Sequence, residues 1–313
     1  MLHLRVVCPA EDTDAVVALV CGQPGVTHVV LHRNAAVQPP GDLVEADLAR
    51  ESADDVLTAL SELGIDHEGG ITVVALDTVL SDAADTAQEQ APGDGADAIV
   101  WEELVARAGE ESRLNATFQS FMVIACLLAA VGAVTDSPVT VVGAMVVGPE
   151  FGPLAAIAVG LVRRRWDLVR RAGLAIGVGF PLAMLVTAAA TALGRLGGLY
   201  DRDSIDHLAQ VDFIYEVGPF SLIVALLAGA AGMLALTSTK SAVLVGVFIS
   251  VATLPAAGFA ALAAVLGEWD RAVESTAQLL INLVGIVVAA ALVLWVRQRR
   301  GDPTGVGRPL VAG

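Results

Sequence analysis

A carboxylate interrupts a long apolar stretch of this sequence. Glu150 lies between two Gly-Pro punctuations, with Gly148 and Pro149 before it and Gly152 and Pro153 after it. At the centre of a membrane, an ionised carboxylate without a partner costs about 3 kcal/mol or more. Glu150 must therefore be protonated, accept bonds from free backbone N–H groups, or hold a cation or proton in transit. Each alternative makes it the first candidate for chemistry in this chain.

The order of the glycines and prolines predicts a helix that stops and restarts. Gly148 suits the left-handed conformation that ends a helix, and Pro149 prevents continuation. Gly152 and Pro153 suit the first turn of a new helix, and the two residues between the pairs are expected to be extended. Such backbone is tolerated inside a membrane only where protein buries it or a cavity hydrates it. The alternative is that the prolines only kink the helix and that Glu150 faces a wet vestibule or a subunit interface.

Polar residues in other apolar runs are candidates to join Glu150. No Lys or Arg lies in the interior of these runs, so an ion pair within the membrane is not expected. The candidates are Thr253, Ser250, Asn282 and Gln278, and Thr253 shortly precedes a second proline break at Pro255. We expect these residues to form one site for a proton or cation, with no cofactor and no bound metal.

Composition separates the chain into an acidic first third and an apolar remainder. The 313 residues are 55% hydrophobic with a net charge of -16, and the mean hydropathy is +0.69. Residues 1–116 hold 5 Arg against 22 Asp and Glu, whereas the rest is almost neutral. This acidic balance argues against nucleic acid as a partner. The first apolar run starts beyond residue 115, so we expect no N-terminal signal peptide.

Six apolar runs are long enough to cross a bilayer, which takes about 20 helical residues. They lie near Thr117–Thr135, Val139–Val162, Ala172–Leu196, Pro219–Thr237, Ala242–Leu266 and Ala277–Val296. Arginine clusters follow the second and the sixth runs, and an acidic loop follows the third. The positive-inside rule then places the N-terminal module and the C-terminus in the cytoplasm. We expect a multi-pass protein of the bacterial cytoplasmic membrane, with the lipid bilayer as a partner and a homo-oligomer as the assembly.

A weak internal repeat relates the first three runs to the last three. Trp-Asp occurs at Trp166 and again at Trp269, 103 residues later. At that offset Glu150 falls on Thr253, and the proline breaks nearly coincide. Three is odd, so two three-span halves must insert in opposite senses, as in transporters with inverted repeats and broken helices. The alternative is two unrelated apolar triplets with a chance Trp-Asp pair.

The N-terminal module reads as strand, helix, strand, strand, helix and strand, which is the ferredoxin-like pattern. We expect this cytoplasmic domain over residues 1–80, an acidic linker and amphipathic helix over 81–116, a transmembrane domain over 117–300, and a cytoplasmic tail over 301–313. Its four histidines show no converging Cys or third ligand, so we interpret them as solvated rather than metal-binding. The cysteines Cys8, Cys21 and Cys126 are expected to be reduced, with a Cys8–Cys21 disulfide as the alternative.

The segment Ser137–Ala172 resembles a known family. It fits the pattern Ser-Pro, Gly-Ala-Met and Pro-x-x-Gly-Pro of the bacterial uncharacterised hydrophobic membrane domains, domain of unknown function 389, and the similarity continues over residues 117–296. The resemblance implies a membrane domain and a motif, and no activity. Position 150 is commonly apolar in that family, so Glu150 would mark a subgroup with its own ion or proton coupling.

Two functions remain open from the sequence. The first is a transporter or channel for a small solute or ion, with its site at the broken helices. The second is a non-transporting membrane sensor or scaffold that signals through the ferredoxin-like domain. An enzyme is not expected, because the runs hold no Ser/His, paired Asp or His-Glu arrangement typical of intramembrane catalysis.

Overall fold

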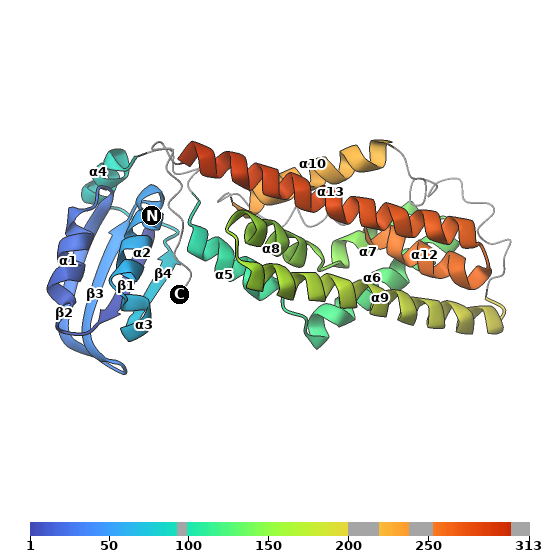
Figure 1. Ribbon diagram of the computed structural model, residues 1–313, viewed down its shortest axis with the longest axis horizontal. Helices are drawn as coiled ribbons and strands as arrows, with labels where there is room; N and C mark the ends of the chain where they lie inside the picture. The colour runs from blue at the N-terminus through green and yellow to red at the C-terminus, as the bar shows by residue number, and fades with distance from the viewer. Residues whose placement is uncertain (93–98, 200–218, 238–252, 302–313) are drawn as a thin grey trace. The chain divides into compact units, whose positions relative to one another are not determined.

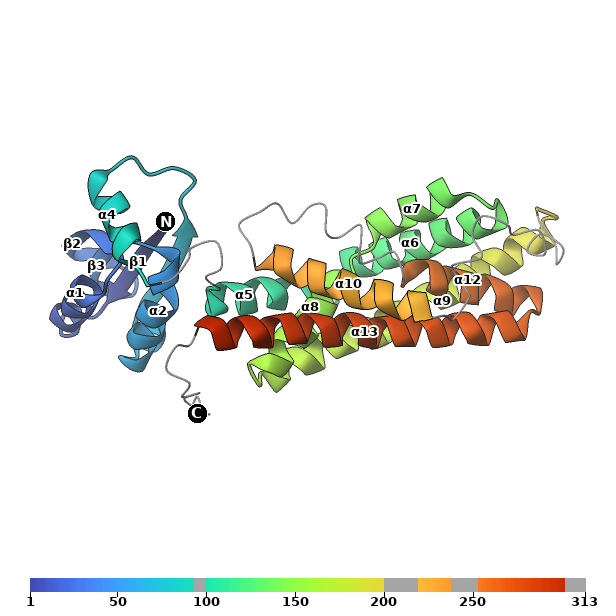
Figure 2. The ribbon, with the colours of Figure 1, turned by 90° about the horizontal axis from the view of Figure 1, so that it is seen from above.

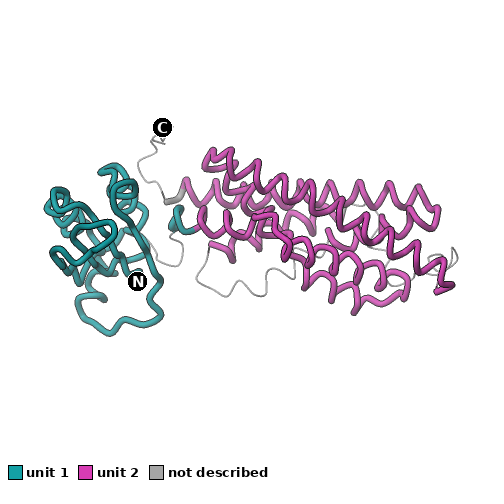
Figure 3. Tube along the Cα trace, turned by 90° about the horizontal axis from the view of Figure 1, so that it is seen from below, with its two compact units in different colours: residues 1–103 teal, residues 104–313 magenta. Residues whose placement is uncertain are grey.

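The computed structural model of the chain describes residues 1–92, 99–199, 219–237 and 253–301 (Figure 1). Ser250, the acidic loop after residue 200 and nearly all of the predicted tail lie outside these residues. The chain divides into two compact units, residues 1–103 and 104–313 (Figure 3). Each unit is built from its own core and is considered by itself.

The first unit is a four-stranded antiparallel sheet with helices. Its strands follow the order β2-β3-β1-β4, and every neighbouring pair is antiparallel. The elements are β1 (Leu2–Cys8), α1 (Thr13–Gly22), β2 (Val26–Val37), β3 (Pro40–Leu48), η1 (Arg50–Ser52), α2 (Ala53–Glu62), α3 (Ile65–Glu68) and β4 (Gly70–Ala75). The predicted strand-helix order is confirmed.

One face of this sheet and the inner faces of α1 and α2 form the core. Alternate residues of β1, Leu2, Leu4 and Val6, are buried, as the period of two in a strand requires. They belong to one apolar cluster with Val16 of α1 and Leu60 of α2. Ser52 is the N-cap residue of α2, but its hydroxyl makes no capping bond, because it donates to the Pro24 carbonyl at 2.6 Å.

Part of the segment predicted as a linker is helical. α4 (Asp82–Gln90) packs on β2 and β3 and buries Ala84 and Ala87. α5 (Trp101–Glu111) follows, and its first residues belong to the first unit. The compact unit therefore extends to Glu103 rather than residue 80, because small apolar side chains in an acidic stretch still supply a face that packs.

The second unit is helical and apolar. Three of its described helices, α6 (Ala116–Val134), α9 (Trp166–Leu196) and α13 (Trp269–Gly301), are long and apolar enough to cross a membrane. α7 (Pro138–Val147) and α8 (Phe151–Val162) form a fourth candidate span that bends by 52° at its break. The predicted break is thus present. α10 (Pro219–Leu236) and α12 (Leu254–Leu266) are shorter, so six spans stay a prediction.

Three pairs of described helices begin at one constant spacing. α6, α8 and α9 begin at Ala116, Phe151 and Trp166, and 103 residues later α10, α12 and α13 begin at Pro219, Leu254 and Trp269. In the sequence this offset is marked by little more than the Trp-Asp pairs. The starts of these helices mark the offset more clearly than the sequence does.

The turn between α8 and α9 recurs between α12 and α13. Arg164 and Gly267 occupy the same position in the two turns, and both have left-handed backbones, with φ of 57° and 89°. In each turn the next residue's amide donates to the carbonyl five residues earlier, from Arg165 to Gly160 at 2.8 Å and from Glu268 to Ala263 at 3.0 Å. This bond closes a helix C-terminus of the Schellman type.

The paired helices run in opposite directions. Figures 1 and 2 show that α9 and α13 run antiparallel, with α8 and α12 leading from the middle of the bundle to opposite ends. The packing is exchanged accordingly, because α8 contacts α13 and α12 contacts α9.

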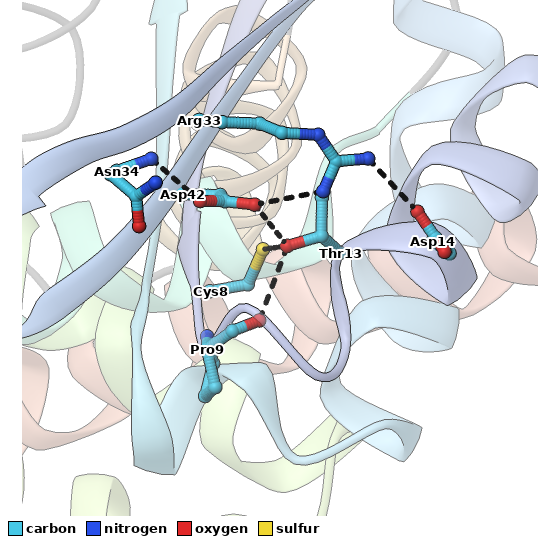
Figure 4. A network of polar contacts seen from close by, with 7 residues as sticks. All are labelled: Cys8, Pro9, Thr13, Asp14, Arg33, Asn34 and Asp42. Atoms are coloured by element: carbon cyan, nitrogen blue, oxygen red, sulfur yellow. Dashed lines mark hydrogen bonds and ion pairs between the residues drawn. The ribbon is translucent and has the colours of Figure 1, made fainter.

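A buried carboxylate fixes the β2–β3 hairpin in the first unit (Figure 4). Asp42 of β3 is 1% exposed, and it accepts the Asn34 amide at 2.7 Å and the Thr13 hydroxyl at 2.8 Å. Asn34 has a positive φ of 53° at an irregularity of β2, and Arg33 lies 3.7 Å from the Asp42 carboxylate. The Asn34 amide and the Thr13 hydroxyl lower the pKa of Asp42.

Asp42→Asn should destabilise the first unit, because two bonds to a charged acceptor become bonds to a neutral one. The equilibrium constant for unfolding of the first unit should rise roughly tenfold or more at pH 7. The measurement is pulsed hydrogen exchange of the full chain in urea, in which peptides from β2 and β3 should show a lower urea midpoint. Asp14→Asn is the matched control, since the Asp14 side chain is 92% exposed.

The same pair of proteins should show a pH dependence of defined sign. A carboxyl group whose pKa is lowered by folding stabilises the folded protein above the usual Asp pKa of about 3.9. This stabilisation is lost as the pH falls through the pKa of the folded state. The difference in unfolding free energy between wild type and Asp42→Asn should therefore be smaller at about pH 3 than at pH 7. A gap that widens in acid would contradict this role for Asp42.

Candidate functional site

The break between α7 and α8 differs in detail from the predicted one. Gly148 is extended, with φ -67° and ψ 128°, rather than left-handed. The residue before a proline is pushed away from helical backbone, so Pro149 accounts for this. Glu150 is not extended, because it lies in the helical region at φ -69° and ψ -18° and is the N-cap of α8. Its carbonyl accepts the Leu154 amide at 3.2 Å and closes the first turn.

Glu150 is fully buried and bonded to the start of the second half-helix. Its side chain is 0% exposed, and its Oε1 accepts the Thr253 hydroxyl at 2.8 Å. Thr253 is the N-cap of α12 and is also fully buried. The Thr253 carbonyl accepts the Ala257 amide at 3.0 Å, which matches the bond from Leu154 to Glu150. The structure thus joins the two residues that the repeat offset pairs.

The two half-helices begin next to each other. A helix N-terminus carries partial positive charge from its free amides, so α8 and α12 both direct favourable potential at the Glu150 carboxylate. Burial opposes the charge, since the carboxylate lies among apolar side chains. The neighbouring apolar cluster contains Met122, Cys126, Leu254 and Leu279. Such a site can stabilise either protonation state of a carboxyl group without a Lys or Arg.

A second polar group lies on α13. The Gln278 amide donates to the Ser221 hydroxyl at 3.2 Å, and that hydroxyl donates to Asn282 Oδ1 at 3.1 Å. Gln278 and Asn282 are buried residues of α13. Ser221 belongs to α10, so these bonds join the two helices. Leu283, the residue after Asn282, packs in the clusters that contain the starts of both half-helices. This stretch of α13 therefore passes the break.

The predicted site residues fall into three places. Glu150 and Thr253 meet directly, while Asn282 belongs to the polar group on α13. The prolines restart the half-helices, with Pro153 in the first turn of α8 and Pro255 in the first turn of α12. Gly148, Pro149 and Gly152 line an open pocket of about 380 Å³. Sequence reasoning missed Ser221, because a single serine near a helix start gives no local signal of its partner.

The pocket opens beside the break. Its other walls are the end of α5, the α5–α6 connection and the start of α6. These segments supply Glu110, Glu111, Arg113, Asn115, Thr117, Phe118 and Phe121, and α8 supplies Phe151. Its size is at the small end of the range for ligand sites. The pocket thus joins polar groups near the α6 start to the backbone next to Glu150.

Three histidines of the first unit lie against carboxylates. His3 and His28 each lie 2.8 Å from Asp47, and His32 lies 3.6 Å from Glu45. Burial alone would raise the pKa of Asp47, but the bonds from His3 and His28 outweigh it and lower the pKa. Within the described residues, no group of His, Cys, Asp and Glu has the geometry of a metal site, and all three cysteines are free.

Long apolar helices, one of them broken at a buried carboxylate, indicate a helical membrane protein. The family model described as Domain of unknown function (DUF389) matches residues 145–288, so this part of the chain carries that domain and the predicted resemblance is confirmed. The matched region contains Glu150 and the four polar residues that were predicted to join it, Thr253, Ser250, Asn282 and Gln278.

One curated relative is similar over part of its length. The uncharacterized protein MJ0678 of Methanocaldococcus jannaschii is 24% identical over 195 residues. That match covers 62% of this chain and 58% of the relative, which is less than two thirds of its length. No solved structure matches the chain. The matched family model and the relative are both described as uncharacterised, so neither indicates an activity.

Thr253→Val should destabilise the second unit, because it removes a hydroxyl that donates to a buried carboxyl oxygen. Leaving such a group without this donor costs about 1–3 kcal/mol. The loss should appear as a lower thermal midpoint in detergent and should shrink in a Glu150→Leu background. Thr276→Val is the control, since its hydroxyl bonds only the Ala272 carbonyl of its own helix. Equal effects in both backgrounds would show that the bond contributes nothing.

Proposed function

We propose that this protein is a multi-pass transporter or channel for a small solute or ion, with its site at the junction of two half-helices. The observation that supports this most is the 2.8 Å bond between Glu150 and Thr253. A fully buried carboxyl group at a break in a membrane helix is costly and serves an ion or proton path more readily than packing. A proton or cation is the species that this group would take.

We further propose that the second unit is an inverted repeat. The constant spacing of helix starts, the recurring turn and the opposite directions of α9 and α13 all support it. Two residues related by a twofold axis meet only when they lie close to that axis. The contact of Glu150 with Thr253, 103 residues apart, supports an axis that passes through the junction. Transporters with this architecture bind substrate where discontinuous helices meet.

The first unit is proposed to be a cytoplasmic ferredoxin-like domain that assembles or regulates the membrane part. Its element order and its strand order β2-β3-β1-β4 support the fold. Arginines near Arg164, in the turn that follows α8, support a cytoplasmic location for that turn. The protein would then lie in the cytoplasmic membrane with both termini inside the cell, and homo-oligomers are part of the proposal.

The inverted repeat predicts that equivalent turns lie on opposite membrane sides. Single cysteines at Arg165→Cys and Glu268→Cys, in a cysteine-free background, should react with an impermeant thiol reagent from opposite faces. The cytoplasmic face should expose position 165, and the outer face position 268. The measurement is labelling of intact cells against inverted vesicles. Labelling of both positions from one face would exclude the inverted arrangement.

Glu150→Gln should abolish or uncouple flux and leave the fold intact, because the amide keeps the shape and loses the titratable group. Proteoliposomes would be tested for proton, Na⁺ and K⁺ flux, and folding by size-exclusion profile and thermal midpoint. Asp167→Asn is the control, since the Asp167 carboxylate is exposed at the first turn of α9. Wild-type flux in Glu150→Gln would remove Glu150 from the mechanism.

The second candidate function is a membrane sensor or scaffold without transport. It is favoured by α5, a single helix whose start belongs to the first unit and whose end belongs to the second. This candidate predicts binding of a metabolite by the first unit and no flux of any tested ion. It would gain support if folded wild-type protein showed no flux while a ligand changed the exposure of α5.

A further inference from the structure

The end of α5 rests directly on the broken helix. A Cβ placed on Gly152 would lie 2.8 Å from both the Cβ and the carbonyl oxygen of Glu111. Real Cβ contacts are never this short, so only glycine lets the two backbones approach as they do. Gly152 is the second residue of α8, two positions after Glu150. The contact therefore falls on the segment that holds the buried carboxylate.

α5 is seated along the bundle by further contacts. Its Ala108 is fully buried, and Gly109 faces Leu168 and Arg171 in the start of α9. Arg107 pairs with Glu111 one turn later at 3.2 Å. The end of the helix is thus an ordered element packed against α8 and α9.

The other end of α5 is held by the first unit. The Trp101 amide donates to the Asp54 carboxylate at 3.3 Å, and Arg50 pairs with Glu103 at 2.9 Å. The first turn of α5 is therefore fixed within the first unit, and its last turn lies in the second.

The open pocket lies at the same place. Glu110, Glu111 and Arg113 line it from α5 and the residues after it, and Gly148 and Pro149 line it from the break. Because Glu111 both lines the pocket and touches Gly152, movement of the α5 end changes the pocket and the break together.

We propose that the end of α5 is a latch on the α7–α8 break. With Glu111 on Gly152, the latch restricts access from the pocket to Glu150, and its displacement opens that access. This regulation rests on the proposed transport site, but the latch itself can be tested without measuring transport.

A reversible lock tests the regulation. Cys8→Ser, Cys21→Ser and Cys126→Ala provide the background, to which Glu111→Cys and Gly152→Cys are added. A disulfide joins Cβ atoms about 3.8 Å apart, so α5 need shift by only about 1 Å from its seated position to form it. In the reduced protein the Cβ at position 152 displaces residue 111, so the latch is open. Oxidation ties residue 111 back to the break and should lower flux by at least about fivefold, and a reductant should restore the higher flux.

A control lock joins α10 to α13, away from the contact of α5 with α8. In Gly285→Cys with Ala225→Cys, a Cβ on residue 285 would lie 3.3 Å from the Cβ of residue 225, close to the separation that a disulfide needs. This lock should leave flux unchanged. Complete cross-linking of positions 111 and 152 with unchanged flux would overturn the latch.

Thiol labelling tests the latch without flux. Phe151 lines the pocket, so Phe151→Cys in the cysteine-free background reports access to the break. Gly152→Ala forces Glu111 away and should raise the labelling rate at least about fivefold. Gly143→Ala is the matched control, since a Cβ there meets nothing within 4 Å, and it should not change the rate.

The two measurements separate the two proposals. Raised labelling in Gly152→Ala with no flux in any variant supports the latch and contradicts transport. Unchanged labelling in folded Gly152→Ala contradicts the latch whatever the flux. If Gly152→Ala does not fold, a second comparison is made. The labelling rate of Pro149→Cys is measured with and without Glu111→Gly, and an equal rate in the two proteins would likewise overturn the latch.

Discussion

The second unit depends on the bond between Glu150 and Thr253 at the start of two half-helices. A break inside an apolar bundle leaves backbone amides that no lipid can satisfy. Here each break begins a new helix whose N-cap carbonyl closes the first turn, at Leu154 in α8 and at Ala257 in α12. The remaining favourable potential of both helix starts points at one carboxyl group. The cost of the two breaks and the cost of the buried acid are therefore reduced by the same arrangement.

Helices α9 and α13 begin 103 residues apart and differ in the side chains that they bury. On α13, Ser275, Gln278 and Asn282 are buried polar residues. The positions 103 residues earlier on α9 are Ala172, Ala175 and Gly179, which are small and buried. Small residues permit close helix packing in a membrane, and polar ones bond across helices. These buried polar groups are therefore found on α13 and are replaced by small residues at the corresponding positions of α9.

The sequence predicted features that depend on local chemistry. The order of strands and helices in the N-terminal module is predicted by local sequence pattern, and the α7–α8 break by glycine and proline. Thr253 is predicted as a polar residue in an apolar run, and the repeat offset also pairs it with Glu150. The conformation of Gly148 was wrong, since the effect of Pro149 on its preceding residue outweighed the preference of glycine for a left-handed end. Contacts such as Glu111 on Gly152, and Ser221 on Asn282, were out of reach because they depend on how helices far apart in sequence pack.

In the proposed transporter, Glu150 changes its protonation or ion occupancy at the junction. Infrared difference spectroscopy of the purified protein in lipid, recorded as pH and cation are varied, measures this change. A carboxyl band of a dry environment should respond to pH or cation, vanish in Glu150→Gln and shift in Thr253→Val. A band that never responds, or one that persists in Glu150→Gln, would contradict this role of Glu150.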